Sequence, residues 1–299
     1  MLPAMKAHRA SKTAEQMALS RAIEARVAAG DRICDDAFAE RFLPRGQQWL
    51  LRSRAVRRAM VSGIERLFAG HHHYVLARTR YLDEFLLQQL QQEVEQLVIL
   101  GAGFDSRPYR FADRLRGISV FEVDHPATSA LKRAKIQAIL GAVPSEVRFV
   151  PIDFNRDELG PSLTNSGFRA GARSLFLWEG TVPYLAAEAV DETLRFVRSS
   201  SRAGSRIVFD YLLRSVLDGT CTFRGAATEY ARMSQTPEPF VYGLPADRVA
   251  DFLAERGFGD VRDAGGDELK TPGFPVSRQA VYVKPWWRIV CRPNSSRPC

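Results

Sequence analysis

Cysteine is scarce in this 299-residue sequence, and its four copies (Cys34, Cys221, Cys291 and Cys299) lie far apart with no CxxC pair. That spacing argues against a disulfide framework or a zinc ribbon and fits a reducing compartment. Long apolar runs are also missing, since no window approaches the roughly 18 apolar residues of a membrane-spanning helix. The opening segment MLPAMKAHRASKTAEQ lacks the apolar core of a signal peptide. We therefore expect a cytoplasmic protein with no membrane partner.

Lysine is scarce as well, because arginine supplies 36 of the 42 basic residues behind the net charge of +8. The excess lies at the two ends: residues 1–85 hold 15 basic and 9 acidic side chains, and residues 284–299 hold four basic and none acidic. The densest stretch, RSRAVRRAMVSGIER (52–66), predicts an amphipathic helix with few aromatics, unlike a nucleic-acid-binding surface. This helix presents either a solvated face or an electropositive wall that attracts an acidic substrate. No nucleic-acid partner is expected.

The pattern of apolar residues changes along the chain. Residues 11–87 show helical periodicity, whereas from residue 97 onward short apolar runs alternate with helical segments. Such alternation predicts βαβ units and a mostly parallel sheet with helices on both faces. The predicted strands are 97–100, 120–123, 147–150, 174–178, 206–210 and 279–283, and the predicted helices between them lie near 126–140, 187–200 and 245–257.

These patterns predict three parts. Residues 1–87 form a helical cap, residues 88–284 form the α/β domain, and residues 285–299 form a basic, irregular tail.

A glycine loop follows the first predicted strand in the sequence LGAGFDSR. Gly101, Ala102 and Gly103 would let the backbone pass close to a nucleotide-type cofactor, and Asp124 ends the second strand at the offset of a ribose-binding carboxylate. The acid Asp105 would repel a pyrophosphate but attract the ammonium group of S-adenosylmethionine. The loop therefore favours S-adenosylmethionine over a nicotinamide dinucleotide and leaves both open.

Acidic residues also end later strands. Asp153 and Phe154 follow the third strand, and Glu179 ends the fourth. Because ligands of open α/β sheets bind at the carboxyl ends of the strands, we expect these acids to converge with Asp124 on one crevice that holds a cationic cofactor.

Histidines offer little metal chemistry. The run His71–His73 predicts a loop or a helix start, with a role in the acceptor pocket or as a base as the alternative. Adjacent helical residues diverge by about 100°, so three in a row do not easily converge on one metal ion. His125 precedes Pro126 and predicts a local helix start. No metal site is expected.

Five motifs carry a family resemblance: SKTAEQMALSRAIEA with YVLARTRYLDEF, LGAGFDSRPYR, EVDHP, PIDF and WEGTVPYL. In this order they resemble the leucine carboxyl methyltransferase family, which includes bacterial polyketide carboxyl O-methyltransferases. The resemblance implies a Rossmann-like, mostly parallel, seven-stranded class I methyltransferase sheet with an N-terminal helical cap, and it implies S-adenosylmethionine as the cofactor.

The resemblance also implies roles for individual residues. Arg78, with help from Arg21, would grip the carboxylate of the cofactor. Gly101, Ala102, Gly103 and Asp105 would form the cofactor loop, Asp124 would hold the ribose, and Asp153 and Phe154 would flank the adenine. Arg78, Glu179 and Tyr184 would lie at the methyl-transfer centre, with Tyr184 lining the acceptor pocket beside Trp178, for which core packing is the alternative.

We therefore predict a methyltransferase that acts on a carboxylate of a small acidic molecule, such as a secondary metabolite. A carboxylate is already ionised at neutral pH, so the reaction would need alignment and a cationic holder but no general base. A hydroxyl or phenol acceptor, which requires a base, is the first alternative. A nicotinamide-dependent oxidoreductase and a non-catalytic interaction protein on the same fold are the others, and the oligomeric state stays open.

Overall fold

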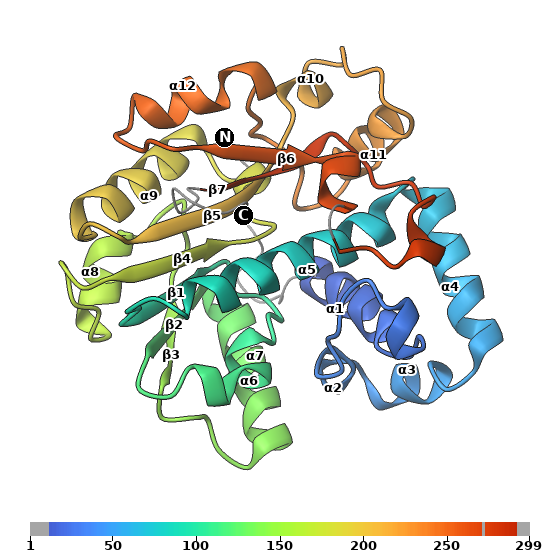
Figure 1. The fold of residues 1–299 in the computed structure, drawn as a ribbon, viewed down its shortest axis with the longest axis horizontal. Coiled ribbons are helices and arrows are strands. Elements are labelled where there is room, and N and C mark those ends of the chain that lie inside the picture. The colour runs from blue at the N-terminus through green and yellow to red at the C-terminus, as the bar shows by residue number, and fades with distance from the viewer. Residues whose placement is uncertain (1–11, 271–272, 292–299) are drawn as a thin grey trace.

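The computed structural model describes residues 12–270 and 273–291. A seven-stranded sheet forms its centre, and helices lie on both faces (Figure 1). The strand order is β3-β2-β1-β4-β5-β7-β6, in which β7 alone runs antiparallel to its neighbours. The strands are β1 (Gln96–Leu100), β2 (Ser119–Asp124), β3 (Val147–Pro151), β4 (Ser174–Trp178), β5 (Arg206–Leu212), β6 (Arg262–Gly265) and β7 (Trp287–Cys291).

The helices fall into two groups along the chain. The N-terminal group is α1 (Lys12–Glu24), α2 (Ala39–Phe42), α3 (Arg45–Leu50), α4 (Arg54–Leu67) and α5 (His71–Gln89). The others are α6 (Arg107–Arg110), α7 (Pro126–Leu140), α8 (Leu159–Asn165), α9 (Ala187–Ser200), α10 (Arg214–Leu217), α11 (Ala226–Met233) and α12 (Val249–Ala254). Short 3-10 turns occur at Ala29–Asp31, Ala112–Arg114, Val182–Tyr184, Ala246–Arg248, Gly266–Lys270 and Val276–Arg278.

The predicted α/β class, the mostly parallel seven-stranded sheet and the N-terminal helical cap are confirmed. Every residue of β1 and β4 is buried, as expected when helices cover both faces of a sheet. Helices α1 to α4 gather beyond one end of the strands, at the right of Figure 1, and α5 runs from them toward the sheet. The predicted boundary at residue 87 falls inside the last turn of α5.

The C-terminal part of the prediction was wrong. Residues 279–283 form no strand, and the predicted irregular tail contains β7, which pairs with both β5 and β6. Pro285 lacks an N–H and interrupts the apolar run, so strand pairing begins beyond it. The charge of Arg288 suggested an exposed tail, but Asp263 on the neighbouring strand neutralises this charge at 2.7 Å within the sheet.

Two smaller corrections concern the same region. The strand β6 (RDAG) was missed because it is a short edge strand without an apolar run. The helix predicted near 245–257 is shorter, since only α12 and the 3-10 turn before it are helical. Residues 292–299 of the predicted tail lie outside the described residues. Across the described ranges, no helix has the length and apolar character needed to cross a membrane.

Candidate functional site

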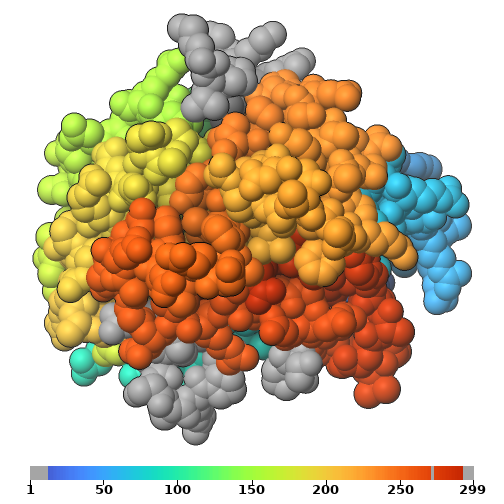
Figure 2. Space-filling view, turned by 90° about the horizontal axis from the view of Figure 1, so that it is seen from above, coloured from blue at the N-terminus to red at the C-terminus, as the bar shows by residue number. Residues whose placement is uncertain are grey.

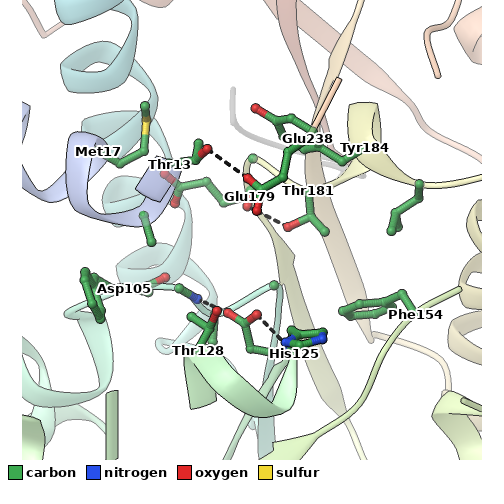
Figure 3. Close-up of a pocket in the computed structure, with 18 of the residues that line it drawn as sticks. Thr13, Met17, Asp105, His125, Thr128, Phe154, Glu179, Thr181, Tyr184 and Glu238 are labelled. Atoms are coloured by element: carbon green, nitrogen blue, oxygen red, sulfur yellow. Dashed lines mark hydrogen bonds between the residues drawn. The ribbon is translucent and has the colours of Figure 1, made fainter. Parts of the chain in front are cut away.

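One cavity of about 400 Å³ opens at the carboxyl ends of β1, β2, β3 and β4. Helices α1 and α5 and a segment at 237–241 complete its walls. Figure 3 shows side chains from these separate elements around a common space. All of the predicted site residues line this cavity: Arg21, Arg78, Gly101, Ala102, Gly103, Asp105, Asp124, Asp153, Phe154, Glu179 and Tyr184.

Gly101 leaves β1 in a conformation and an environment that exclude larger residues. Its φ is +68°, in the left-handed region that costs other L-residues roughly 1–2 kcal/mol. A Cβ at this position would also lie 1.8 Å from Oγ1 of Thr181. The turn after β1 therefore brings its backbone directly against the loop after β4.

Asp124 fixes the same turn from β2. Its Oδ2 accepts a hydrogen bond from the N–H of Gly103 at 2.5 Å, and its Oδ1 accepts one from the N–H of His125 at 2.6 Å. Burial raises the pKa of Asp124, while the two N–H groups counteract part of that shift. The ends of β1 and β2 are thus held together by one carboxylate that also lines the cavity.

Glu179 lies between two arginines at the end of β4. Its Oε1 is 2.9 Å from Nε of Arg78, and its Oε2 accepts a 2.7 Å hydrogen bond from Nη1 of Arg107. Burial by itself raises the pKa of Glu179, but the two guanidiniums outweigh it and hold the pKa at about 2. Glu179 is therefore ionised at neutral pH and unsuited to act as a general base.

Arg78 is buried on α5 and anchored to β5. Its Nη1 donates a 2.5 Å hydrogen bond to Oδ2 of Asp210, whose Oδ1 accepts one from the N–H of Gly180 at 2.5 Å. Nη2 of Arg78 donates to the sulfur of Met17 on α1 at 3.5 Å. The Arg78 guanidinium therefore links α5 to both α1 and β5.

The other charged site residues are also paired. Arg21 bonds Asp36 at 2.8 Å and donates to the carbonyl oxygen of Phe104 at 2.7 Å, which ties α1 to the glycine loop. The two oxygens of Asp105 accept from the backbone N–H and the Nη1 of Arg107, at 2.8 and 2.6 Å. Both residues therefore shape the loop.

The opposite side of the cavity carries two aromatic rings beside two acids. Asp153 accepts from the N–H of Asn155 at 3.1 Å, beside Phe154. The Tyr184 ring lies 5.4 Å from Phe240. Figure 3 shows Tyr184 near Glu238, whose Oε2 accepts a 3.1 Å hydrogen bond from Thr13 of α1.

Several residues that the sequence singled out lie elsewhere. None of Arg52–Arg66 and none of His71–His73 lines this cavity, so the basic helix is not the wall of this site. The three histidines begin α5, and within the described ranges no group of His, Cys, Asp and Glu is placed to hold a metal ion. Trp178 is fully buried in the core. His125 caps α7, as predicted, by accepting from the N–H of Ala127.

Arg107 and Asp210 are site residues that were not predicted from the sequence. Arg107 lies within the quoted motif LGAGFDSRPYR but received no role. Asp210 ends the predicted strand 206–210, so the same criterion could have found it, although the observed β5 continues to Leu212. Thr13, Met17 and the segment 237–241 were likewise not predicted.

Comparison with known proteins identifies the lineage. The family model for leucine carboxyl methyltransferase matches residues 14–198, which is more than half of the chain. The chain belongs to this leucine carboxyl methyltransferase family. The match includes every one of the predicted site residues named above.

Individual relatives agree with the family assignment. A Mycolicibacterium smegmatis protein, provisionally assigned as an S-adenosyl-L-methionine-dependent methyltransferase, is 33% identical over 216 residues, covering 69% of this chain and 67% of the relative. A Mycobacterium avium protein with the same assignment is 38% identical over 138 residues, covering 46% of this chain but only 43% of the relative. The chain thus spans less than half the length of some curated relatives that it matches.

A solved structure supports the fold. A provisionally assigned methyltransferase from Thermobifida fusca superposes with a TM-score of 0.54 at 15% identity, covering 80% of this chain and 89% of that protein. At this identity the likeness concerns the fold alone. The sheet of this family member is therefore the class I methyltransferase sheet.

Proposed function

We propose that this family member is an S-adenosylmethionine-dependent O-methyltransferase that methylates a carboxylate of a small, largely apolar molecule. The observation that carries the proposal is the Glu179 carboxylate, which is held ionised between Arg78 and Arg107 in the cavity beside the glycine loop. A permanently ionised acid at this place suits a cationic ligand group and does not suit proton transfer.

The residues present fit the cofactor. Gly101 and Gly103 keep the loop after β1 free of side chains, where a Cβ on Gly101 would collide with Thr181. Asp124 would accept from the ribose hydroxyls, and Asp153 and Phe154 would flank the adenine. Glu179 would receive the ammonium group, and Nη2 of Arg78 would receive the carboxylate. The cofactor supplies an electrophilic methyl group on a sulfonium, which the acceptor oxygen takes up as the carbon–sulfur bond breaks.

The choice of a carboxylate acceptor rests on two cavity residues, His125 and Glu179, that are unsuited to act as a general base. Among the described residues, His125 is the histidine that lines the cavity, and its Nδ1 is engaged in capping α7. Glu179 has a pKa of about 2 and is equally unsuited. A carboxylate acceptor needs no deprotonation at neutral pH, because its ordinary pKa is about 4.

The acceptor would lie beside the apolar wall. Leu185, Pro239 and Val241 line the cavity near Tyr184. Burial raises the pKa of Tyr184, so its hydroxyl stays protonated and can donate a hydrogen bond to the acceptor carboxylate. A largely apolar acid of the secondary-metabolite kind fits this wall, and the cytoplasmic location expected from the sequence stays a prediction.

Titration calorimetry tests the cofactor. S-adenosylmethionine and S-adenosylhomocysteine should bind with micromolar affinity, whereas NADH and NADPH should not bind. Asp124→Asn should weaken binding of the adenosyl compounds by about 1–3 kcal/mol, the scale of charge-assisted hydrogen bonds. Asp113→Asn, an exposed acid far from the cavity, is the matched control. Equal affinities of wild type and Asp124→Asn would remove Asp124 from the site.

The acceptor class needs a separate experiment. A pool of small acids and phenols is incubated with enzyme and cofactor, and products that gain one methyl group are identified by mass. Mild alkali hydrolyses a methyl ester and leaves a methyl ether intact. Alkali-labile products are expected, and alkali-stable products would establish the hydroxyl alternative instead.

A further inference from the structure

A second cavity lies on the other side of the N-terminal helices. It has a volume of about 770 Å³ and shares no lining residue with the cofactor cavity. Its walls are the end of α1, the following turn, α4, His72 and residues 277–278. We call it the arginine groove, because Arg26, Arg54, Arg57, Arg58 and Arg278 line it.

Three of these arginines come from one face of α4. Arg54, Arg57 and Arg58 are spaced i, i+3 and i+4, so their side chains are neighbours on the helix. None of the three has an ion-pair partner among the described residues, and Arg57 donates instead to the carbonyl oxygens of Leu51 and Arg52. Like charges at this spacing disfavour the helix, so an anion bound between them would stabilise it.

The two acids of the groove interact with other residues that line it. Glu24 accepts from the N–H of Ile33 at 2.6 Å and faces Arg278 at 3.5 Å. Asp31 accepts from the hydroxyl of Ser277 at 2.6 Å. The remaining cation, Arg26, is paired with Glu40 outside the lining. Arg54, Arg57 and Arg58 are therefore the groove cations without an acidic partner among the described residues, and they outnumber Asp31, whose carboxylate is hydrogen-bonded to a neutral hydroxyl.

His72 adds an unsatisfied polar group. It is 1% exposed, lines the groove, and its Nδ1 has no hydrogen-bond partner within the described part of the chain. Burial lowers the pKa of His72 to about 3, so the ring is neutral. A buried polar atom without a partner is unfavourable, and a ligand hydroxyl could supply the missing hydrogen bond.

We propose that the arginine groove binds a small phosphorylated molecule through Arg54, Arg57 and Arg58. The planar guanidinium matches phosphate oxygens in pairs, and the first turns of α4 add the positive end of a 14-residue helix. Ile23, Val27 and Val61 supply an apolar wall for the rest of the ligand. The volume suits a small organic ligand better than a lone ion.

The groove is accessible to such a ligand. Helix α4 lies at the outer edge of the molecule in Figure 1, and the blue segment that carries it protrudes at the right of the space-filling view in Figure 2. Arg54 and Arg58 are exposed. Binding here is independent of the proposed methyl transfer, because the two cavities are separate.

The test is a calorimetric titration with inorganic pyrophosphate, performed with and without S-adenosylhomocysteine. Wild type should show saturable binding under both conditions. The double variant Arg54→Gln/Arg58→Gln should bind about tenfold more weakly, equivalent to about 1.4 kcal/mol. The matched control, Arg52→Gln/Arg66→Gln, removes the same charge from exposed positions beside and on α4 that do not line the groove, and it should bind as wild type does.

Two results would overturn the proposal. One is the absence of pyrophosphate binding by wild type; if the protein then binds phosphatidylserine vesicles, the helix meets a lipid surface instead. The other is equal weakening in both double variants, which would indicate diffuse attraction. Binding of S-adenosylhomocysteine by Arg54→Gln/Arg58→Gln is measured in parallel, so failure of the cofactor site is recognised separately.

Discussion

The guanidinium of Arg107 donates a 2.7 Å hydrogen bond to Oε2 of Glu179 and so joins the glycine loop to the end of β4. The same guanidinium bonds Asp105 at 2.6 Å and Asp83 at 2.7 Å. Burial disfavours its charge, but the surrounding carboxylates raise the pKa of Arg107 well above its usual value. Arg107 thus shares with Arg78 the role of holding the proposed ammonium-binding carboxylate in place and ionised.

Arg107→Gln should lower the free energy of unfolding by about 3–5 kcal/mol, because it leaves buried carboxylates without their partner. It should also raise the pKa of Glu179. When the pH is lowered, the variant should therefore lose affinity for S-adenosylhomocysteine at a higher pH than wild type does. Urea denaturation and calorimetry over a pH series measure both effects.

The control for this experiment is Arg110→Gln. Arg110 also pairs with Asp83 and with Asp36, but it makes no contact with Glu179. It should destabilise the fold without moving the pH profile of binding. Identical profiles for the two variants would reduce Arg107 to a structural residue.

Acid should remove the stability that Glu179 contributes. Its pKa is lowered from 4.5 to about 2, so this contribution is present above pH 4.5 and is lost as the pH falls toward 2. The full shift corresponds to about 3 kcal/mol, of which about 2 kcal/mol is lost by pH 3. Urea denaturation at pH 7 and pH 3 should show this extra loss in wild type relative to Glu179→Gln. Groups such as Glu122 are common to both proteins and cancel, so parallel losses would contradict the assignment.

The α/β architecture could be predicted from the sequence because the signals for its strands and turns lie in short, continuous segments. Each buried strand is a short apolar run, and Gly101, Asp124 and Glu179 follow such runs directly. Carboxyl ends of parallel strands meet at one edge, so residues at those ends could be assigned to one crevice without coordinates.

Features that depend on pairing between distant residues escaped the sequence. Arg107 contacts Asp83 and Glu179, which lie 24 and 72 positions away. Likewise, Arg288 reads as tail charge until Asp263 on the adjacent strand is placed beside it. Neither partner is recognisable from spacing, because both contacts arise only when the sheet is assembled.

Gly101→Ala should lower the free energy of unfolding more than an alanine substitution does at a glycine that has a positive φ but open space around it. The variant combines the backbone penalty of roughly 1–2 kcal/mol with a Cβ placed 1.8 Å from Oγ1 of Thr181. Gly141→Ala is the matched control, since its φ is +83° but no atom lies within 4 Å of the added Cβ. Thermal and urea unfolding should show the larger loss for Gly101→Ala. Equal losses would mean that Thr181 moves aside at little cost, and the close approach of the two loops would not be required.

Ile289→Asp should prevent folding, because it tests whether residues 287–291 belong to the core. Ile289 is fully buried in β7 between β5 and β6, and an unpaired carboxylate placed there costs several kcal/mol. Val276→Asp introduces the same charge in place of another aliphatic side chain in this C-terminal region, but at a position that is 93% exposed. Circular dichroism and gel filtration should find Val276→Asp folded and Ile289→Asp unfolded or aggregated. If Ile289→Asp folded as well as the control, the segment would be the irregular tail that its charge suggests, and β5 would lose its antiparallel neighbour.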